Sequence, residues 1–333
     1  MKIAVIFTGG TIGSHISETG FISPKGGNGY LLLNHYEEKY GRTVDFETFE
    51  PYRILSENLS AANLKILIET VSKIIKSGEF EGIIITHGTD TLQYTASILQ
   101  YVFADYKYPI VLVSSAFVLS DERANGHTNF EKAVSFIEAK AGSGVFVSYK
   151  NTTDTPAMHR GNRLQNALSF SDDVSSILGS HYGKWIEDYY IPNEKYVIAK
   201  GNVNTVFPAD KIKLDEDSSK IVRIKAMPGM CYPDISDCKA VLYEGYHSGT
   251  VCIDEKLKAF ANKAKAIDIP IFVTGLTDSE AMYETVEKYK ELGIIPLVNC
   301  SAISQYCKLW LTTSNDLPIL DIMSKSVAED WCF

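Results

Sequence analysis

Two short segments near the start of the chain combine threonine with glycine in an arrangement that suits nucleophilic chemistry. Residues 8–13 read Thr-Gly-Gly-Thr-Ile-Gly directly after an apolar run, and residues 86–91 read Thr-His-Gly-Thr-Asp-Thr directly after another. In open α/β sheets, ligands bind at the carboxyl ends of the strands. The two segments therefore predict one site lined by hydroxyl groups.

Each segment offers specific groups to such a site. Glycine lets the backbone turn sharply and lets a ligand approach closely, and the hydroxyl of Thr11 can act as a nucleophile if a neighbour accepts its proton. Thr89 and Asp90 place a hydroxyl beside a carboxylate, which suits binding of an ammonium group or acceptance of a proton. Threonine and aspartate also cap turns and helices, so a structural role for these residues stays open.

Alternating strand and helix patterns must position these segments. Short runs rich in Ile and Val predict strands at residues 3–7, 83–86, 110–114 and 145–148, and helical periodicity predicts helices at residues 60–76, 91–103 and 129–139. Ser60 is the expected N-cap of the first of these helices. This alternation is typical of βαβ units and a parallel sheet.

The composition changes between residues 189 and 217, where proline, glycine, asparagine and an acidic cluster interrupt the periodic pattern. We therefore expect a first domain over residues 1–190, a linker over 191–217 and a second domain over 218–333. Further strands are predicted at 221–225, 240–243, 271–274 and 295–298, with helices at 254–266 and 279–292. The predicted fold class is α/β, with a smaller α/β domain at the carboxyl terminus.

The two threonine segments resemble the two signatures of the bacterial-type L-asparaginases, with most similarity to the cytoplasmic type I branch. Arg-Gly-Asn-Arg at residues 160–163 and Pro-Gly at residues 228–229 add to the resemblance, which runs in order along nearly the whole chain. The resemblance implies a flavodoxin-like amino-terminal domain. It also implies hydrolysis of the side-chain amide of L-asparagine to L-aspartate and ammonia, through an acyl-threonine.

The resemblance further implies a role for individual residues. The substrate is expected to be a small amino acid. Carboxylate side chains would bind its α-ammonium, and hydroxyl and N–H groups would bind its α-carboxylate. By motif, Thr11 is the nucleophile, and Thr89 supplies a second hydroxyl beside Asp90. Ser56 is expected to hold the α-carboxylate of the substrate, and Glu57 together with Asp90 its α-ammonium. The carbonyl of Ala116 is expected to bind the substrate amide. The family also implies a homo-oligomer, a homodimer or a homotetramer.

The chain departs from the family pattern at three places. Phe21 stands where the family has a tyrosine on the loop after the first signature, and Asn166 stands where it has a lysine. Neither phenylalanine nor asparagine can relay a proton as those residues do. The third departure is the segment at residues 245–250, which either contacts a ligand or forms a turn. Tyr30, Lys150 and His247 are the available replacements.

Whole-chain properties narrow the function. The chain has 333 residues, of which 45% are hydrophobic, and its net charge of −9 argues against a nucleic-acid partner. Neither a signal peptide nor a membrane-spanning stretch is evident, so we expect a cytoplasmic protein without membrane attachment. The six cysteines and seven histidines are dispersed, which predicts no metal site, and no cofactor is implied. Two alternatives stay open, a different small amide substrate and a catalytically silent amino-acid-binding protein.

Overall fold

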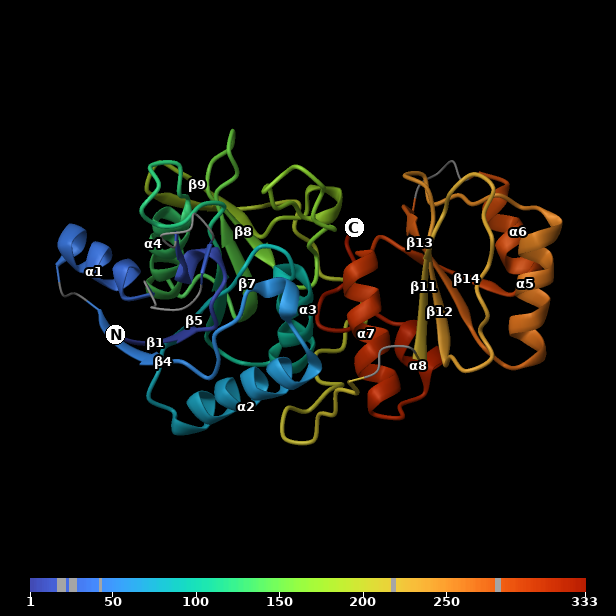
Figure 1. Ribbon diagram of the computed structural model, residues 1–333, viewed down its shortest axis with the longest axis horizontal. Coiled ribbons are helices and arrows are strands. Elements are labelled where there is room, and N and C mark those ends of the chain that lie inside the picture. The colour runs from blue at the N-terminus through green and yellow to red at the C-terminus, as the bar shows by residue number, and fades with distance from the viewer. Residues whose placement is uncertain (17–21, 24–28, 42–43, 217–219, 279–282) are drawn as a thin grey trace.

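The computed structural model describes the whole chain except residues 17–21, 24–28, 42–43, 217–219 and 279–282. Residues 2–192 contribute an eight-stranded sheet with the order β10-β9-β8-β7-β6-β5-β1-β4 (Figure 1). Its strands are β1 Lys2–Phe7, β4 Asp45–Phe49, β5 Gly82–Thr86, β6 Pro109–Val113, β7 Gly144–Tyr149, β8 Ala157–Arg160, β9 Gly183–Ile186 and β10 Tyr189–Pro192.

The parallel part of this sheet has the strand order of flavodoxin. Strands β4, β1, β5, β6 and β7 run parallel, and β8, β9 and β10 continue the sheet in antiparallel fashion. The chain passes from β1 to β4 on one side and later to β5 on the other, so the order reverses between β1 and β5. Such a reversal leaves a crevice at the carboxyl ends of the two strands. The predicted fold class and the four predicted strands of this domain are confirmed.

Helices cover both faces of the sheet. α2 (Ala61–Ser77) and α3 (Leu92–Phe103) pack on one face, while α1 (Gly29–Tyr40) and α4 (Gly126–Glu138) pack on the other. The hydroxyl of Ser60 accepts a hydrogen bond from the backbone of Asn63 at 3.3 Å, as expected for the N-cap of α2. The helix α1 was not predicted from the sequence.

The connection through α4 differs in hand from the other crossovers. From β5 to β6 and from β6 to β7 the chain steps in the same direction across the sheet, yet α3 and α4 lie on opposite faces. Crossovers between parallel strands are right-handed in about 98% of cases. The connections through α1, α2 and α3 agree with one another in hand, so the α4 connection is the left-handed exception.

A second, four-stranded parallel sheet forms the carboxyl-terminal part of the chain. Its order is β11 (Ile221–Lys225), β12 (Ala240–Glu244), β13 (Ile271–Leu276), β14 (Ile294–Val298). One face is covered by α5 (Glu255–Ala266) and α6 (Thr285–Glu291), and the other by α7 (Ala302–Ser314) and α8 (Ile319–Met323). Figure 1 shows α7 between the second sheet and α3, so this helix packs against both parts of the molecule.

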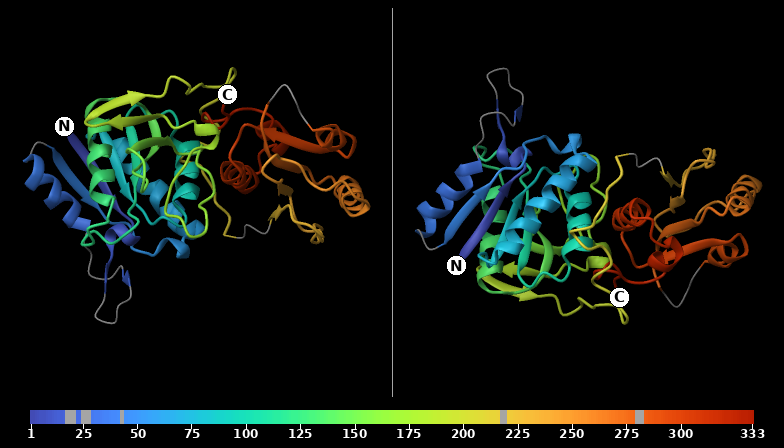
Figure 2. Two further views of the ribbon diagram at one scale, coloured as in Figure 1. Left: turned by 90° about the horizontal axis from the view of Figure 1, so that it is seen from above. Right: turned by 90° about the horizontal axis from the view of Figure 1, so that it is seen from below.

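The two sheets lie side by side along the long axis of the molecule. Both views of Figure 2 show the amino terminus within the larger part and the carboxyl terminus where the two parts meet. The end of the chain therefore returns from the second sheet to the boundary with the first.

We expected residues 191–217 to be a linker, but the described part of this segment, residues 191–216, is packed against the first domain. Phe207 and Leu214 are 1% and 2% exposed and belong to the core beneath α2 and α3. Val203 forms an isolated bridge with Val327 from the end of the chain. The expected boundary at residue 190 also falls inside strand β10. Within the described residues, no helix is long and apolar enough to cross a membrane.

Candidate active site

The two threonine segments meet at the crevice between β1 and β5. Phe7 at the end of β1 lies in register with Thr86 at the end of β5, so both segments leave the same edge of the sheet side by side. The hydroxyl of Thr8 donates to the carbonyl of Thr86 at 2.6 Å, which ties the two strand ends together. Thr8 is therefore a structural residue, whereas Thr11 begins the short 3₁₀ turn η1 (Thr11–Gly13) and is half-buried.

Glycine is required where the turns touch. Gly10 has a φ of 74°, and a Cβ built there would lie 2.3 Å from the backbone nitrogen of Gly88. A Cβ on Gly88 would lie 2.4 Å from the hydroxyl oxygen of Ser56. The backbones of the two threonine segments therefore approach each other as closely as glycine permits, and Ser56 lies against the second.

The segment around Ser56 is held at the same edge by backbone hydrogen bonds. The N–H of Ile54 donates to the carbonyl of Thr8 at 3.0 Å, and the N–H of Gly10 donates to the carbonyl of Ile54 at 2.9 Å. Ser56 then opens the turn η2 (Ser56–Asn58) and is buried. Its hydroxyl donates to the Asp90 carboxylate at 3.1 Å, and the Thr91 hydroxyl donates to the Ser56 carbonyl at 2.9 Å.

Asp90 does not cap the following helix through its side chain. α3 begins at Leu92 with Thr91 in the N-cap position, and this cap makes no side-chain hydrogen bond to the helix. The carboxylate of Asp90 is exposed and accepts instead from Ser56. The role of the Asp90 carboxylate in the site stays a prediction, with which its contact to Ser56 is compatible.

His87 was not singled out from the sequence, although it directly precedes Gly88. It is buried, with Nδ1 2.8 Å from the carbonyl of Gly88 and Nε2 2.8 Å from the hydroxyl of Thr95. A carbonyl can only accept, so Nδ1 carries the hydrogen and Nε2 accepts from Thr95. Burial lowers the pKa of His87, which favours the neutral imidazole. The ring therefore fixes the turn that presents Thr89 and Asp90.

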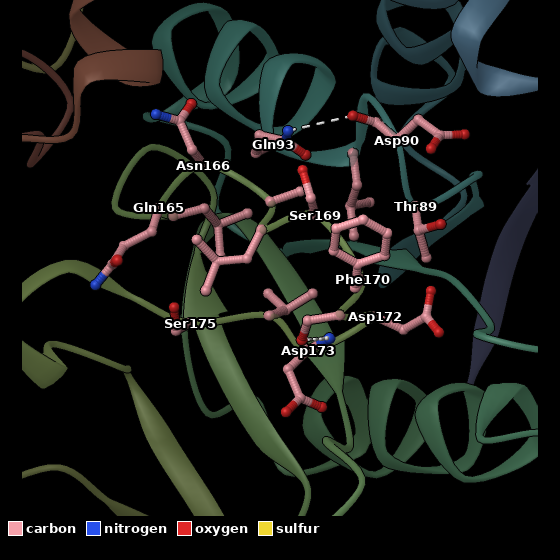
Figure 3. A pocket seen from close by; sticks show the side chains of 16 residues that line it. Thr89, Asp90, Gln93, Gln165, Asn166, Ser169, Phe170, Asp172, Asp173 and Ser175 are labelled. Atoms are coloured by element: carbon pink, nitrogen blue, oxygen red, sulfur yellow. Dashed lines mark hydrogen bonds between the residues drawn. The ribbon is translucent and has the colours of Figure 1, made fainter. Parts of the chain in front are cut away.

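A cavity of about 430 Å³ opens beside Thr89 and Asp90 (Figure 3). Its remaining wall is formed by Leu92 and Gln93 of α3 and by residues 164–175, which include the carboxylates of Asp172 and Asp173. Phe170, whose ring is drawn in Figure 3, belongs to the segment at residues 164–175. The volume lies within the range of small-molecule sites. As far as the chain is described, Thr89 and Asp90 are the only predicted site residues in this lining.

Glu57 and Ala116 lie outside that lining. Glu57 is exposed on the turn η2, one residue after Ser56. Ala116 is half-buried after β6, and its N–H donates to the side-chain oxygen of Asn125 at 2.9 Å. The structure thus places Ser56 against Asp90 directly and Thr11 next to the Gly10–Gly88 contact, and shows no contact of Glu57 or Ala116 with these groups.

Asn166 faces the second domain. Its amide nitrogen donates to Glu244 at 3.3 Å, and its amide oxygen accepts from the guanidinium of Arg223 at 3.2 Å. Arg223 also bonds to Glu244, and it donates to the hydroxyl of Tyr94 at 2.7 Å. Asn166 therefore bonds to both partners of an ion pair that lies within the second sheet. Phe21 lies outside the described residues.

The three possible replacement groups are exposed side chains. Tyr30 lies in the first turn of α1 and packs its ring against Phe7, with centroids 5.8 Å apart. Lys150 follows β7, and His247 lies in the turn after β12. That turn is closed by a 2.7 Å hydrogen bond from the N–H of Gly249 to the carbonyl of Tyr246. Within the described ranges, no three His, Cys, Asp or Glu side chains converge to hold a metal ion.

Comparisons with known proteins agree with this arrangement of strands and turns. A sequence model described as asparaginase, N-terminal, matches residues 2–178, which is more than half of the chain. A protein from Methanobrevibacter smithii that is described as a subunit of a glutamyl-tRNA(Gln) amidotransferase is 26% identical over 351 residues, covering 99% of this chain and 77% of that protein.

Two further matches come from Thermococcus kodakarensis. Its L-asparaginase is 24% identical over 342 residues, covering 98% of each chain. The solved structure of the thermostable L-asparaginase from that organism superposes over the full length of both chains with a TM-score of 0.79 and 22% sequence identity. At that identity the likeness shows a shared fold.

Proposed function

This chain belongs to the asparaginase family, and on that premise we propose that it hydrolyses the side-chain amide of L-asparagine to L-aspartate and ammonia. Thr11 attacks the amide carbonyl, ammonia leaves, and water then releases the product from the acyl-threonine. The observation that carries the proposal is the meeting of the two threonine turns and Ser56 at the reversal between β1 and β5.

The neighbouring groups have complementary roles in this proposal. The hydroxyl of Ser56 binds the α-carboxylate of the substrate, and the carboxylates of Asp90 and Glu57 bind its α-ammonium. Thr89 supplies a second hydroxyl beside Asp90, and the carbonyl of Ala116 accepts from the substrate amide. The hydroxyl of Ser56 lies 3.1 Å from the carboxylate of Asp90. This contact supports the proposal that the two side chains bind the α-carboxylate and the α-ammonium at the same end of the substrate.

The first experiment is ammonia release from L-asparagine by the purified protein, with L-glutamine as a second substrate. Thr11→Val is expected to reduce the rate to about a thousandth of the wild-type value or less, because it removes the attacking oxygen. Thr70→Val is the matched control, since Thr70 is partly exposed on α2 and its hydroxyl donates to the carbonyl of Ile66 in the same helix. Equal rates for Thr11→Val and the wild type would refute the assignment of the nucleophile.

The relatives described as subunits of glutamyl-tRNA(Gln) amidotransferases favour a second candidate function. In this candidate, the chain releases ammonia from an amide donor for use by a partner protein. A higher kcat/KM for L-glutamine than for L-asparagine would favour it over the first proposal. Saturable thermal stabilisation by either amino acid without ammonia release would instead indicate a binding protein.

We also propose a homo-oligomer. Leu168 and Phe170 are 71% and 109% exposed beside the candidate site, and large exposed apolar side chains next to a site are typical of interfaces. Light scattering should give a mass that is a multiple of 37.0 kDa. A monomer at all concentrations would contradict this proposal.

A further inference from the structure

A separate cavity of about 370 Å³ lies where the amino-terminal ends of α2 and α3 meet α7. Three aromatic side chains form part of its wall: Tyr94 from α3, and Tyr306 and Trp310 from α7. The ring centroids of Tyr94 and Tyr306 are 6.1 Å apart, and those of Tyr306 and Trp310 are also 6.1 Å apart. The rings are therefore neighbours on one side of the cavity.

The rest of the lining is apolar or weakly polar, with one exception. Leu59, Ala61 and Leu64 supply aliphatic surface, and Ser60 and Thr91 supply hydroxyl groups. Among the described lining residues, Glu216 carries the only charge. Aromatic faces bear partial negative charge, and a carboxylate adds a full one. The cavity is therefore suited to a ligand that is positively charged and partly apolar.

A cation already lies against one of these rings, that of Tyr306, and it belongs to a residue outside the cavity lining. The guanidinium of Arg223 lies 5.6 Å from the ring centroid of Tyr306 and donates to the hydroxyl of Tyr94 at 2.7 Å. Its charge is paired with Glu244. The charge of Arg223 is thus already paired, and among the described lining residues Glu216 is the charged group that can attract a cation.

We propose that this cavity binds a small organic ammonium ion, of the quaternary or alkylated type. The ammonium group would lie against the rings of Tyr306 and Trp310, with Glu216 as its counter-ion. Cation–π contacts of this kind are the usual means of recognising quaternary ammonium ligands. The site is distinct from the candidate active site and does not depend on its function.

The two sites share a wall, which the experiment must take into account. Thr91 lines the aromatic cavity, while its hydroxyl donates to the carbonyl of Ser56 in the candidate active site. Asp90, the preceding residue, lines the other cavity and is exposed there. A cation could therefore bind to Asp90 instead, and a variant at that position separates the two locations.

The test compares choline with its neutral isostere 3,3-dimethylbutan-1-ol, by ligand-observed NMR titration of the full-length protein. Choline is expected to bind about tenfold more tightly than the alcohol, because only the charged ligand gains the cation–π contacts. Equal affinities for the two ligands would overturn the proposal. So would a failure of the wild-type protein to bind choline in the millimolar range.

Variants locate the binding. Trp310→Leu is expected to abolish the preference for choline, and Glu216→Gln to weaken choline binding about threefold. Glu194→Gln, which changes another exposed glutamate, is the matched control. Asp90→Asn is expected to leave choline binding unchanged. If Asp90→Asn abolishes binding while Glu216→Gln does not, the ammonium occupies the candidate active site and the proposal is wrong. Glu216 is exposed, so its variant tests the proposal even if Trp310→Leu fails to fold.

Discussion

At the residue scale, Asn166 shows how one substitution is absorbed by its surroundings. An amide has both a donor and an acceptor, and here the donor meets the carboxylate of Glu244 while the acceptor meets the guanidinium of Arg223. A lysine at this position would offer donors only. It would compete with Arg223 for Glu244 and would leave the Arg223 nitrogen without its acceptor.

We therefore expect Asn166→Lys to leave amide hydrolysis unchanged or lower, rather than to raise it. The physical reason is that the side chain is directed to the second domain and its ammonium would be held by Glu244. The measurement is kcat/KM for L-asparagine. Asn262→Lys, on the exposed side of α5, adds the same charge as a control. An increase confined to Asn166→Lys would show that the missing ammonium can still reach the catalytic groups.

The buried His159 makes the stability of the fold depend on pH. Burial lowers the pKa of His159 to about 3, and the nearby His181 and Lys184 contribute to the lowering. The unfolded chain binds a proton at this residue below about pH 6.5, whereas the folded chain does not. The free energy of unfolding should therefore fall as the pH drops from 6.5 towards 3.

Between pH 7 and pH 5, this histidine should cost about 2 kcal/mol of stability. Urea unfolding at the two pH values measures the change. His159→Gln keeps a polar group next to Ser176, which is the partner of Nδ1, and should remove that part of the pH dependence. The same pH dependence in His159→Gln and the wild type would show that His159 is not responsible.

At the scale of elements, the site depends on turns that touch through glycine. We expect Gly10→Ala to reduce amide hydrolysis about a hundredfold, because the new methyl group must push the turn at Gly88 away. Gly78→Ala is the matched control. Gly78 has a similar φ of 71°, but a Cβ there has no atom within 4 Å, so it costs only backbone strain of about 1 kcal/mol.

Activity assays and urea unfolding on both variants separate the two effects. If the close contact between Gly10 and Gly88 is needed for activity, Gly10→Ala loses activity while Gly78→Ala keeps it. If both variants keep full activity, the close approach of Gly10 to Gly88 is not needed for the site.

At the scale of the whole molecule, the end of the chain joins the two sheets. Lys308 of α7 and Asp330 form a fully buried ion pair at 3.0 Å. The Asp330 carboxylate also accepts from Tyr101 of α3 at 2.9 Å and from Gln305 at 3.0 Å. Arg163, which follows β8, donates to the carbonyls of Glu329 and Trp331. The last residues are therefore part of the first domain's packing as well as of the second's.

We expect Lys308→Met to lower the free energy of unfolding by about 3 to 5 kcal/mol, because it leaves the Asp330 charge buried without its partner. Lys258→Met breaks an exposed pair with Glu255 and should have little effect. Urea unfolding measures both. The double variant Lys308→Met/Asp330→Leu should recover part of the loss, since neither charge is then left alone. A small effect of Lys308→Met would show that the pair contributes little.

Local patterns in the sequence were sufficient to predict most of the parallel strands and the glycine and threonine segments that follow two of them. Short runs rich in Ile and Val predicted β1, β5, β6, β7 and the four strands of the second sheet, because an apolar run is a local property of the chain. The glycine and threonine segments were predicted to end strands for the same reason. Their meeting at one edge followed from the geometry of parallel strands, and it is confirmed for the two segments.

The way in which distant segments combine became visible in the folded chain alone. The contact of Ser56 with Asp90, the left-handed connection through α4 and the orientation of Asn166 each depend on residues far apart in the chain. The packing of residues 191–216 and of the last residues against the first domain was equally absent from the predictions, because their apolar side chains show no regular period. Such contacts are fixed by the packing free energy of the whole molecule, which no local pattern records.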